Sequence, residues 1–219
     1  MKNFKSMLTL LVIATIVTAA NAQSPATTTG KLQTTIGIKG GANLSNLYVN
    51  DVKDENAKIG FQAGLFVKAP ITKFFSIQPE LIYSQKGSQL EYNNLFATGT
   101  AKFNLHYVEL PVMAVINLGN HFNLQAGPYI AYLAGVTTRN KGTSAGQYDF
   151  EKNVSRDNFE TLDYGVAGGF GFDADKVGVG VRYNYGLQEV GKEQTVLGQP
   201  YRFNNGKNSV LQVYLTLGL

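Results

Sequence analysis

Seven charged residues lie on the same face of the predicted strands as glycine and small polar residues, where they could form ion pairs inside the protein. Four are cations and three are anions: Lys39, Lys68, Lys86 and Arg182, with Glu80, Glu109 and Asp163. If the face is enclosed, these charges must pair, because a lone desolvated charge is strongly unfavourable. We therefore predict a structural charge cluster in which Glu80 and Glu109 pair with Arg182, whose planar guanidinium matches carboxylate geometry.

Other residues that could do chemistry are sparse. The two histidines, His106 and His121, are far apart and have no serine in a recognisable motif beside them. We expect both at the surface or rim, and no catalytic residue, metal site or cofactor. The glycines of residues 165–171 lie inside a predicted strand with no helix after it, so they lack the helix N-terminus on which a phosphate-binding turn depends.

The chain is organised around residues 163–187, DYGVAGGFGFDADKVGVGVRYNYGL. Bulky apolar residues alternate there with glycine and charge on both sides of residues 173–176, which predicts a β-hairpin with two unlike faces. A soluble sheet usually turns its large apolar side chains inward. Here the opposite face is too small and too charged for an ordinary outer surface, so we predict that lipid contacts the apolar face.

The same alternation predicts six further strands, at residues 32–48, 58–70, 75–87, 103–118, 121–136 and 209–219. Connections after the second, fourth and sixth strands are short, and the others are long. This pattern is typical of an all-β, eight-stranded antiparallel up-and-down transmembrane barrel. Its even strand number places both termini at the periplasmic, short-turn rim. Eight strands leave a lumen only wide enough for side chains to fill.

The N-terminus reads as an export signal. Lys2 and Lys5 precede an apolar run, and Ala20-Asn21-Ala22 suits cleavage after Ala22. We thus expect a cleaved signal peptide at 1–22, a flexible lead at 23–31 and the barrel at 32–219. The absence of cysteine excludes disulfides and a lipoprotein anchor. Net charge falls from +4 to +2 when Lys2 and Lys5 leave with the signal, which gives no reason to expect nucleic-acid binding.

Two alternative interpretations remain open from the residues alone. A soluble, lipocalin-like ligand-binding barrel would also alternate, but with apolar residues inside; the glycine-rich charged face and the lack of a helical segment after the last strand disfavour it. A narrow channel would use the inward charges as a constriction. The preferred interpretation is a non-enzymatic, monomeric protein with a filled polar interior.

The long connections are candidate binding surfaces, since loops on a rigid scaffold often carry binding. They hold both charge signs and aromatic residues: Arg139, Tyr148, Phe150, Arg156, Phe159, Tyr201 and Arg202. Apart from outer-membrane lipid, the expected partner is an envelope or extracellular protein.

Seven short motifs, in order along the expected mature chain, carry a resemblance to a known family. They are IGIKGGANLSNL (36–47), FQAGLFVKAP (61–70), SIQPELIYSQKG (76–87), YVELPVMAVI (107–116), AGPYIAYLAG (126–135), DYGVAGGFGFD (163–173) and GVGVRYNYGL (178–187). The set resembles the PorT-like outer-membrane β-barrel family of Bacteroidetes. The resemblance implies an integral barrel in a Gram-negative outer membrane. Some members of that family are tied to secretion across the envelope, and most have no assigned activity.

Overall fold

The computed structural model describes residues 32–48, 55–94, 97–143, 147–153, 159–191, 193–196, 199–202 and 206–219. The expected signal peptide and flexible lead, residues 1–22 and 23–31, lie outside these ranges. In the described part of the chain, no helix has the length and apolar character needed to cross a membrane.

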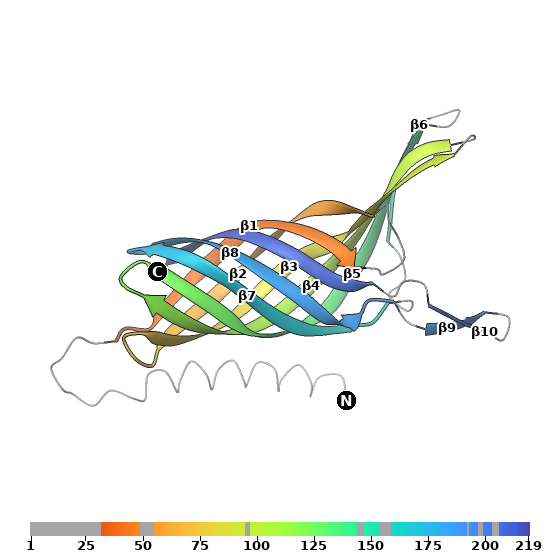
Figure 1. The fold of residues 1–219 in the computed structure, drawn as a ribbon. Coiled ribbons are helices and arrows are strands. Elements are labelled where there is room, and N and C mark those ends of the chain that lie inside the picture. Colours follow the sequence, from red (N-terminus) through yellow and green to blue (C-terminus); the bar gives the residue numbers. More distant parts are fainter. Residues whose placement is uncertain are drawn as a thin grey trace, which may run out of the picture.

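Eight antiparallel strands close a barrel within the described ranges (Figure 1). Each pairs with its neighbours in the chain, and the first pairs with the last, from Gly37 opposite Gly218 to Tyr48 opposite Lys207. Closure gives every barrel strand two partners, which removes the unpaired edges that hydrocarbon could not hydrogen-bond. The predicted fold is confirmed. The barrel strands are β1 (Thr35–Tyr48), β2 (Glu55–Pro70), β3 (Phe75–Asn94), β4 (Ala97–Leu118), β5 (Phe122–Thr143), β7 (Leu162–Ala174), β8 (Val177–Glu189) and β11 (Lys207–Gly218).

The two ends of the barrel differ. Three short turns, at residues 71–74, 119–121 and 175–176, define what we call the short-turn end. The start of β1 and the end of β11 also lie there, where Leu219 N donates to Ile36 O at 2.8 Å. The opposite end, which carries the longer connections, is called the long-loop end.

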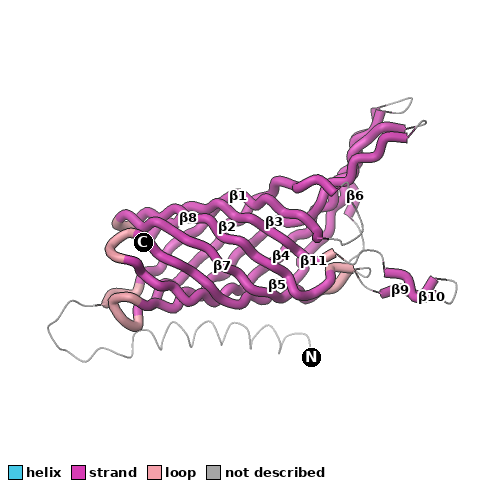
Figure 2. Tube along the Cα trace, in the orientation of Figure 1, coloured by secondary structure: helices cyan, strands magenta, loops and turns pink. Residues whose placement is uncertain are grey.

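At the long-loop end, two expected loops are strands instead (Figure 2). The polar segment 87–100 continues β3 to Asn94 and begins β4 at Ala97, and β5 runs on to Thr143 and pairs with β6 (Gln147–Asn153). A small hairpin joins β9 (Glu193–Val196) to β10 (Gln199–Arg202). The alternation did not predict these strands because polar and charged residues dominate their sequences and no long run of alternating apolar residues marks them.

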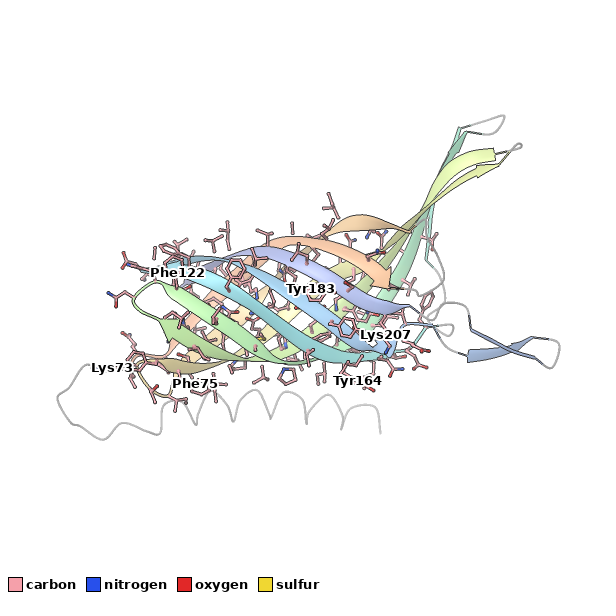
Figure 3. The ribbon with its side chains drawn as sticks, viewed as in Figure 1. Lys73, Phe75, Phe122, Tyr164, Tyr183 and Lys207 are labelled. Atoms are coloured by element: carbon pink, nitrogen blue, oxygen red, sulfur yellow. The ribbon has the colours of Figure 1, made fainter. Side chains whose placement is uncertain are left out.

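The outer surface carries the apolar rows. In β8, Val179 and Tyr183 are exposed, whereas Gly180, Arg182 and Asn184 are buried. Figure 3 shows side chains projecting outward around the barrel wall, including labelled Phe75, Phe122, Tyr164 and Tyr183. This arrangement is the reverse of a soluble ligand-binding barrel, in which large apolar residues would fill the centre. The lipid-facing orientation predicted from residues 163–187 is therefore the one that the fold adopts.

Glycines on the inner face make room for large lumen side chains. A Cβ on Gly165 would lie 2.8 Å from Cε1 of Tyr129, and one on Gly171 would lie 2.9 Å from Oδ1 of Asn123. The small inner face of β7 is thus the counterpart of bulky groups on the neighbouring strands.

Candidate functional site

The lumen contains a buried ion cluster centred on Glu80, nearer to the short-turn end. We call it the Glu80 cluster; its members are Lys39, Gln78, Glu80, Gln125, Arg182 and Tyr214. Arg182 donates to both carboxylate oxygens of Glu80, at 2.7 and 2.8 Å, and Lys39 Nζ lies 3.0 Å from Oε2. These three side chains are at most 1% exposed. Bidentate guanidinium–carboxylate geometry makes this one of the stronger types of ion pair.

Neutral groups complete the Glu80 cluster. The amide of Gln78 donates to Glu80 Oε1 at 2.8 Å, and Arg182 donates to Gln125 Oε1 at 2.6 Å. The Tyr214 hydroxyl donates to the same Gln125 oxygen at 3.2 Å, and the Tyr214 ring lies 3.9 Å below Lys39 Nζ. Glu80 therefore accepts from three different side chains, contributed by β1, β3 and β8.

A second cluster lies farther toward the long-loop end. This Lys86 cluster comprises Lys86, Tyr107, Glu109, Tyr129, Asp163 and Asn208. Lys86 Nζ is 2.8 Å from Glu109 Oε1 and 3.6 Å from Asp163 Oδ2, and its side chain is fully buried. Asn208 donates to Asp163 Oδ2 at 2.9 Å. The rings of Tyr107 and Tyr129 face the ammonium at 5.1 and 4.8 Å.

The predicted pairing of Arg182 was half right. Glu80 pairs with Arg182, but Glu109 pairs with Lys86. The reason is position along the barrel: Glu109 lies opposite Ile82 in the β3–β4 register, beyond Glu80 toward the long-loop end. Which charges share a level depends on strand register and tilt, which the alternation does not encode.

A third pair stands at the short-turn rim and involves a residue that we did not predict. Lys68 Nζ lies 2.8 Å from Asp173 Oδ2, and Asn123 donates to the same oxygen at 3.0 Å. Gln125 in turn donates to Asn123 Oδ1 at 2.8 Å, which links this rim to the Glu80 cluster. Asp173 lies near the end of β7, on the same alternating positions as the inward-facing residues of that strand. This position could have predicted that its side chain faces the lumen.

An apolar cap fills the long-loop end of the lumen. It consists of Leu105, Leu133, Val136, Phe159 and Val190, all at most 8% exposed and in one contact cluster. Backbone bonds hold it, from Glu160 N to Val190 O at 2.9 Å and from Leu133 N to Thr161 O at 2.8 Å. The prediction that Phe159 belongs to a loop binding surface is therefore wrong, because burying its ring in the cap keeps it from solvent.

The other predicted loop residues are spread over several elements. Arg139 lies in β5, Tyr148 and Phe150 in β6, and Tyr201 and Arg202 in β10, while Arg156 lies outside the described residues. In the β5–β6 register Asn140 stands opposite Phe150 and Gly142 opposite Tyr148. The β5–β6 extension therefore gathers three of the seven residues on one paired ribbon.

A polar cavity of about 330 Å³ lies at the short-turn end of the lumen. We call it the vestibule. Gln78, Gln125 and Tyr214 of the Glu80 cluster line its inner part, and Lys68 and Asp173 line its rim. Residues of all three short turns also border it: Lys73, Asn120 and Asp175. The lumen thus has three zones: an open polar vestibule, a middle zone that contains both buried ion clusters, and an apolar cap.

Both histidines lie at the surface. His106 Nδ1 is 2.7 Å from the exposed Tyr83 hydroxyl on the barrel's outer side. His121, in the turn after β4, stacks on Phe172 and its Nδ1 is 2.9 Å from Asp173 O. Among the described residues, no three His, Cys, Asp or Glu side chains are grouped so that they could hold a metal ion.

Among solved structures, the chain is similar to the attachment invasion locus protein Ail of Yersinia pestis, at 10% identity, covering 85% of this chain and 99% of Ail with a TM-score of 0.46. For Neisserial surface protein A the identity is 12%, the alignment covers 85% of this chain and 97% of that protein, and the TM-score is 0.46. For the outer membrane protein OprG of Pseudomonas aeruginosa the identity is 13%, the alignment covers 84% of this chain and 91% of OprG, and the TM-score is 0.34.

A sequence comparison with curated proteins finds no match. The profile of one family, described as outer membrane protein beta-barrel domain, matches residues 21–190, which is most of the chain. The chain is a member of this outer-membrane β-barrel family, an integral outer-membrane protein whose lipid-facing strands enclose the ion clusters described above.

Proposed function

We propose that the protein is a non-catalytic, monomeric barrel that presents a binding surface for an envelope or extracellular protein at its long-loop end. The observation that carries this proposal is the extension of β3, β4, β5 and β6 beyond the barrel wall (Figure 1). Paired strands hold Arg139, Tyr148 and Phe150 on a sheet, which is a firmer platform than separate loops.

The lumen supports a structural rather than a conducting role. Two buried ion clusters and an apolar cap lie in series between the vestibule and the long-loop end, and this weighs against the narrow-channel alternative. Planar-bilayer recordings of the wild type and Arg182→Ala test the point. We expect closed behaviour from the wild type; steady conductance that changes with Arg182→Ala would support the channel instead.

We further propose that the short-turn end and both chain termini face the periplasm, as in up-and-down barrels whose long connections are extracellular. The motif resemblance to the PorT-like family of Bacteroidetes supports a place in the envelope of such an organism and a connection with secretion. A cysteine at Thr72, in the exposed turn 71–74, reports the orientation. A polymer-linked maleimide should modify it only in broken cells.

The binding surface can be tested by photocrosslinking in native envelopes. A photoreactive phenylalanine replaces Tyr148 in β6, and the matched control replaces Tyr183, which is exposed on the apolar wall. We expect a discrete protein adduct from position 148 and none from position 183. The same replacement at Phe150 in β6 and at Tyr201 in β10 extends the scan. Absence of a protein adduct at all three positions would contradict the proposal, and a self-adduct would contradict the monomer.

A further inference from the structure

We propose that the vestibule is a binding site for small water-soluble anions bearing a carboxylate or phosphate group, and that it is entered and left only from the short-turn end. The side of the membrane from which solutes arrive rests on the orientation in the proposed function. The site itself, its chemistry and its closed inner end rest on the lumen geometry alone.

The size and lining of the vestibule suit a small polar solute. A volume of about 330 Å³ lies at the lower end of the range of small-molecule pockets, roughly 300–1,000 Å³. Its inner wall carries the amides of Gln78 and Gln125. Each –NH₂ group has two hydrogens, and the bonds to Glu80 and Asn123 use one apiece. The wall therefore holds further N–H donors of the kind that carboxylate and phosphate oxygens accept.

The charge around the vestibule is positive. Among the residues that line it are three lysines, Lys68, Lys73 and Lys176, and two aspartates, Asp173 and Asp175. Directly behind the inner wall, Lys39 and Arg182 outnumber Glu80 in the Glu80 cluster. Cations therefore exceed anions by one at each level. A cleft with low-dielectric walls and one sign of excess charge concentrates ions of the opposite sign.

Two of the acidic groups near the vestibule are already engaged by donors, and the third, Asp175, lies in the exposed turn 175–176 at its mouth. Glu80 accepts from Lys39, Arg182 and Gln78, and Asp173 accepts from Lys68 and Asn123. A cation moving inward past the mouth would thus meet two carboxylates, Asp173 and Glu80, that already accept hydrogen bonds from cationic and amide donors. An anion would instead meet lysine ammonium groups at the mouth and amide donors within.

The inner end of the vestibule is closed. A solute beyond Gln125 meets the Glu80 cluster, then the fully buried Lys86 and Glu109, then the apolar cap around Phe159. Passage would require breaking two sets of desolvated ion pairs, each strongly unfavourable to disrupt. The described lumen is therefore a blind site and not a route across the membrane.

The absence of native cysteine allows a direct test with single-cysteine variants in detergent or lipid nanodiscs. Thr216→Cys places a thiol on the vestibule wall, and Ala131→Cys places one in the buried lumen farther in, at 1% exposure. Two methanethiosulfonate reagents of similar size, one sulfonate and one trimethylammonium, are compared in rate. The labelling rate of each reagent is divided by the rate of the same reagent with a free thiol in solution, which removes the difference in intrinsic reactivity between the two reagents.

At Thr216→Cys we expect the normalised sulfonate rate to exceed the ammonium rate by about tenfold at low salt, falling as salt is raised. Neutralising the turn cations with Lys73→Gln and Lys176→Gln should lower this ratio several-fold without unfolding the barrel, since both lie in exposed turns. Millimolar phosphate or succinate should slow labelling, and choline chloride at equal ionic strength should not. Ala131→Cys should stay unreactive.

Two results would overturn the inference. A ratio near one, or one favouring the ammonium reagent, would remove the anion preference. Labelling of Ala131→Cys as fast as Thr216→Cys would show that the lumen is open farther in. Neither result depends on which way the barrel lies in the membrane. If the Thr72→Cys turn were instead modified in intact cells, the proposed orientation would fail while the anion site stood.

Discussion

Removing the charge of Glu80 should be the most damaging isosteric change in the lumen. In Glu80→Gln the side chain keeps its shape, but Lys39 and Arg182 lose the one carboxylate that both contact, at 3.0 and 2.7 Å. All three side chains are at most 1% exposed. Breaking a buried pair by removing one partner costs about 3–5 kcal/mol. Here two cations are left facing each other, so we expect a loss in the upper part of that range.

Glu109→Gln is the matched control, because it makes the same chemical change at an equally buried carboxylate. Lys86 keeps Asp163 at 3.6 Å, so one cation and one anion remain. The loss should then be that of a charged hydrogen bond, about 1.5–3 kcal/mol. Adding Lys39→Met to Glu80→Gln removes one of the two unmatched cations and should restore about 1 kcal/mol or more in a double-mutant cycle.

The assay is reversible urea unfolding of the barrel in lipid vesicles, followed by tyrosine fluorescence and by the mobility difference between folded and unfolded forms on gels. With a slope of about 2 kcal/mol/M, Glu80→Gln should lower the midpoint by roughly 2 M. Equal midpoints for Glu80→Gln and Glu109→Gln would refute the reasoning. Such a result would mean that water from the vestibule already solvates Lys39 and Arg182 in the folded barrel.

Three further predictions use the same unfolding assay. Gly169→Ala should destabilise by about 1–3 kcal/mol, because its Cβ would crowd Cα of Arg182 at 2.8 Å, whereas Gly168→Ala should be tolerated, because its nearest contact is 3.8 Å away. Val213→Arg, on the lipid face of β11, should cost about 2–4 kcal/mol, against about 0–1 kcal/mol for Leu219→Arg at the barrel end. Asp173→Asn should change stability by less than about 1 kcal/mol, because this carboxylate is 39% exposed and its pair with Lys68 is screened by water.

Side-chain alternation was enough to predict the barrel and the inward placement of its charges. Period 2 separates the two faces of a strand wherever one face meets lipid, as in β7 and β8. It could not separate the levels of the lumen. Glu80 and Glu109 have the same local pattern, yet one meets Arg182 and the other Lys86, because the register of β3 against β4 sets their heights.

The apolar cap was missed for a related reason. Leu105 and Leu133 lie on the inward face of their strands, where the alternation implied polar neighbours, and Phe159 comes from a segment without any period. The neighbouring sequence does not show that a residue packs in this cap, because its contacts come from four separate parts of the chain. The long-loop strands were hidden similarly, since outside the membrane neither face of a strand such as β6 has to be apolar.

The order of the lumen zones bears on why the charges are there at all. A barrel that only needed to be stable could fill its lumen with apolar side chains, because replacing a buried ion pair in this way is often neutral or favourable. The cap around Leu133 and Phe159 shows that this chain does so at one end. At the other end, an apolar filling would close the vestibule and remove the donors that line it. The Glu80 cluster instead ties β1, β3 and β8 together across the lumen while keeping a polar, positively charged floor behind Gln125. The cluster lies between the open vestibule and the closed part of the lumen. In that position it can offer a polar surface to the vestibule and also block the passage of solutes.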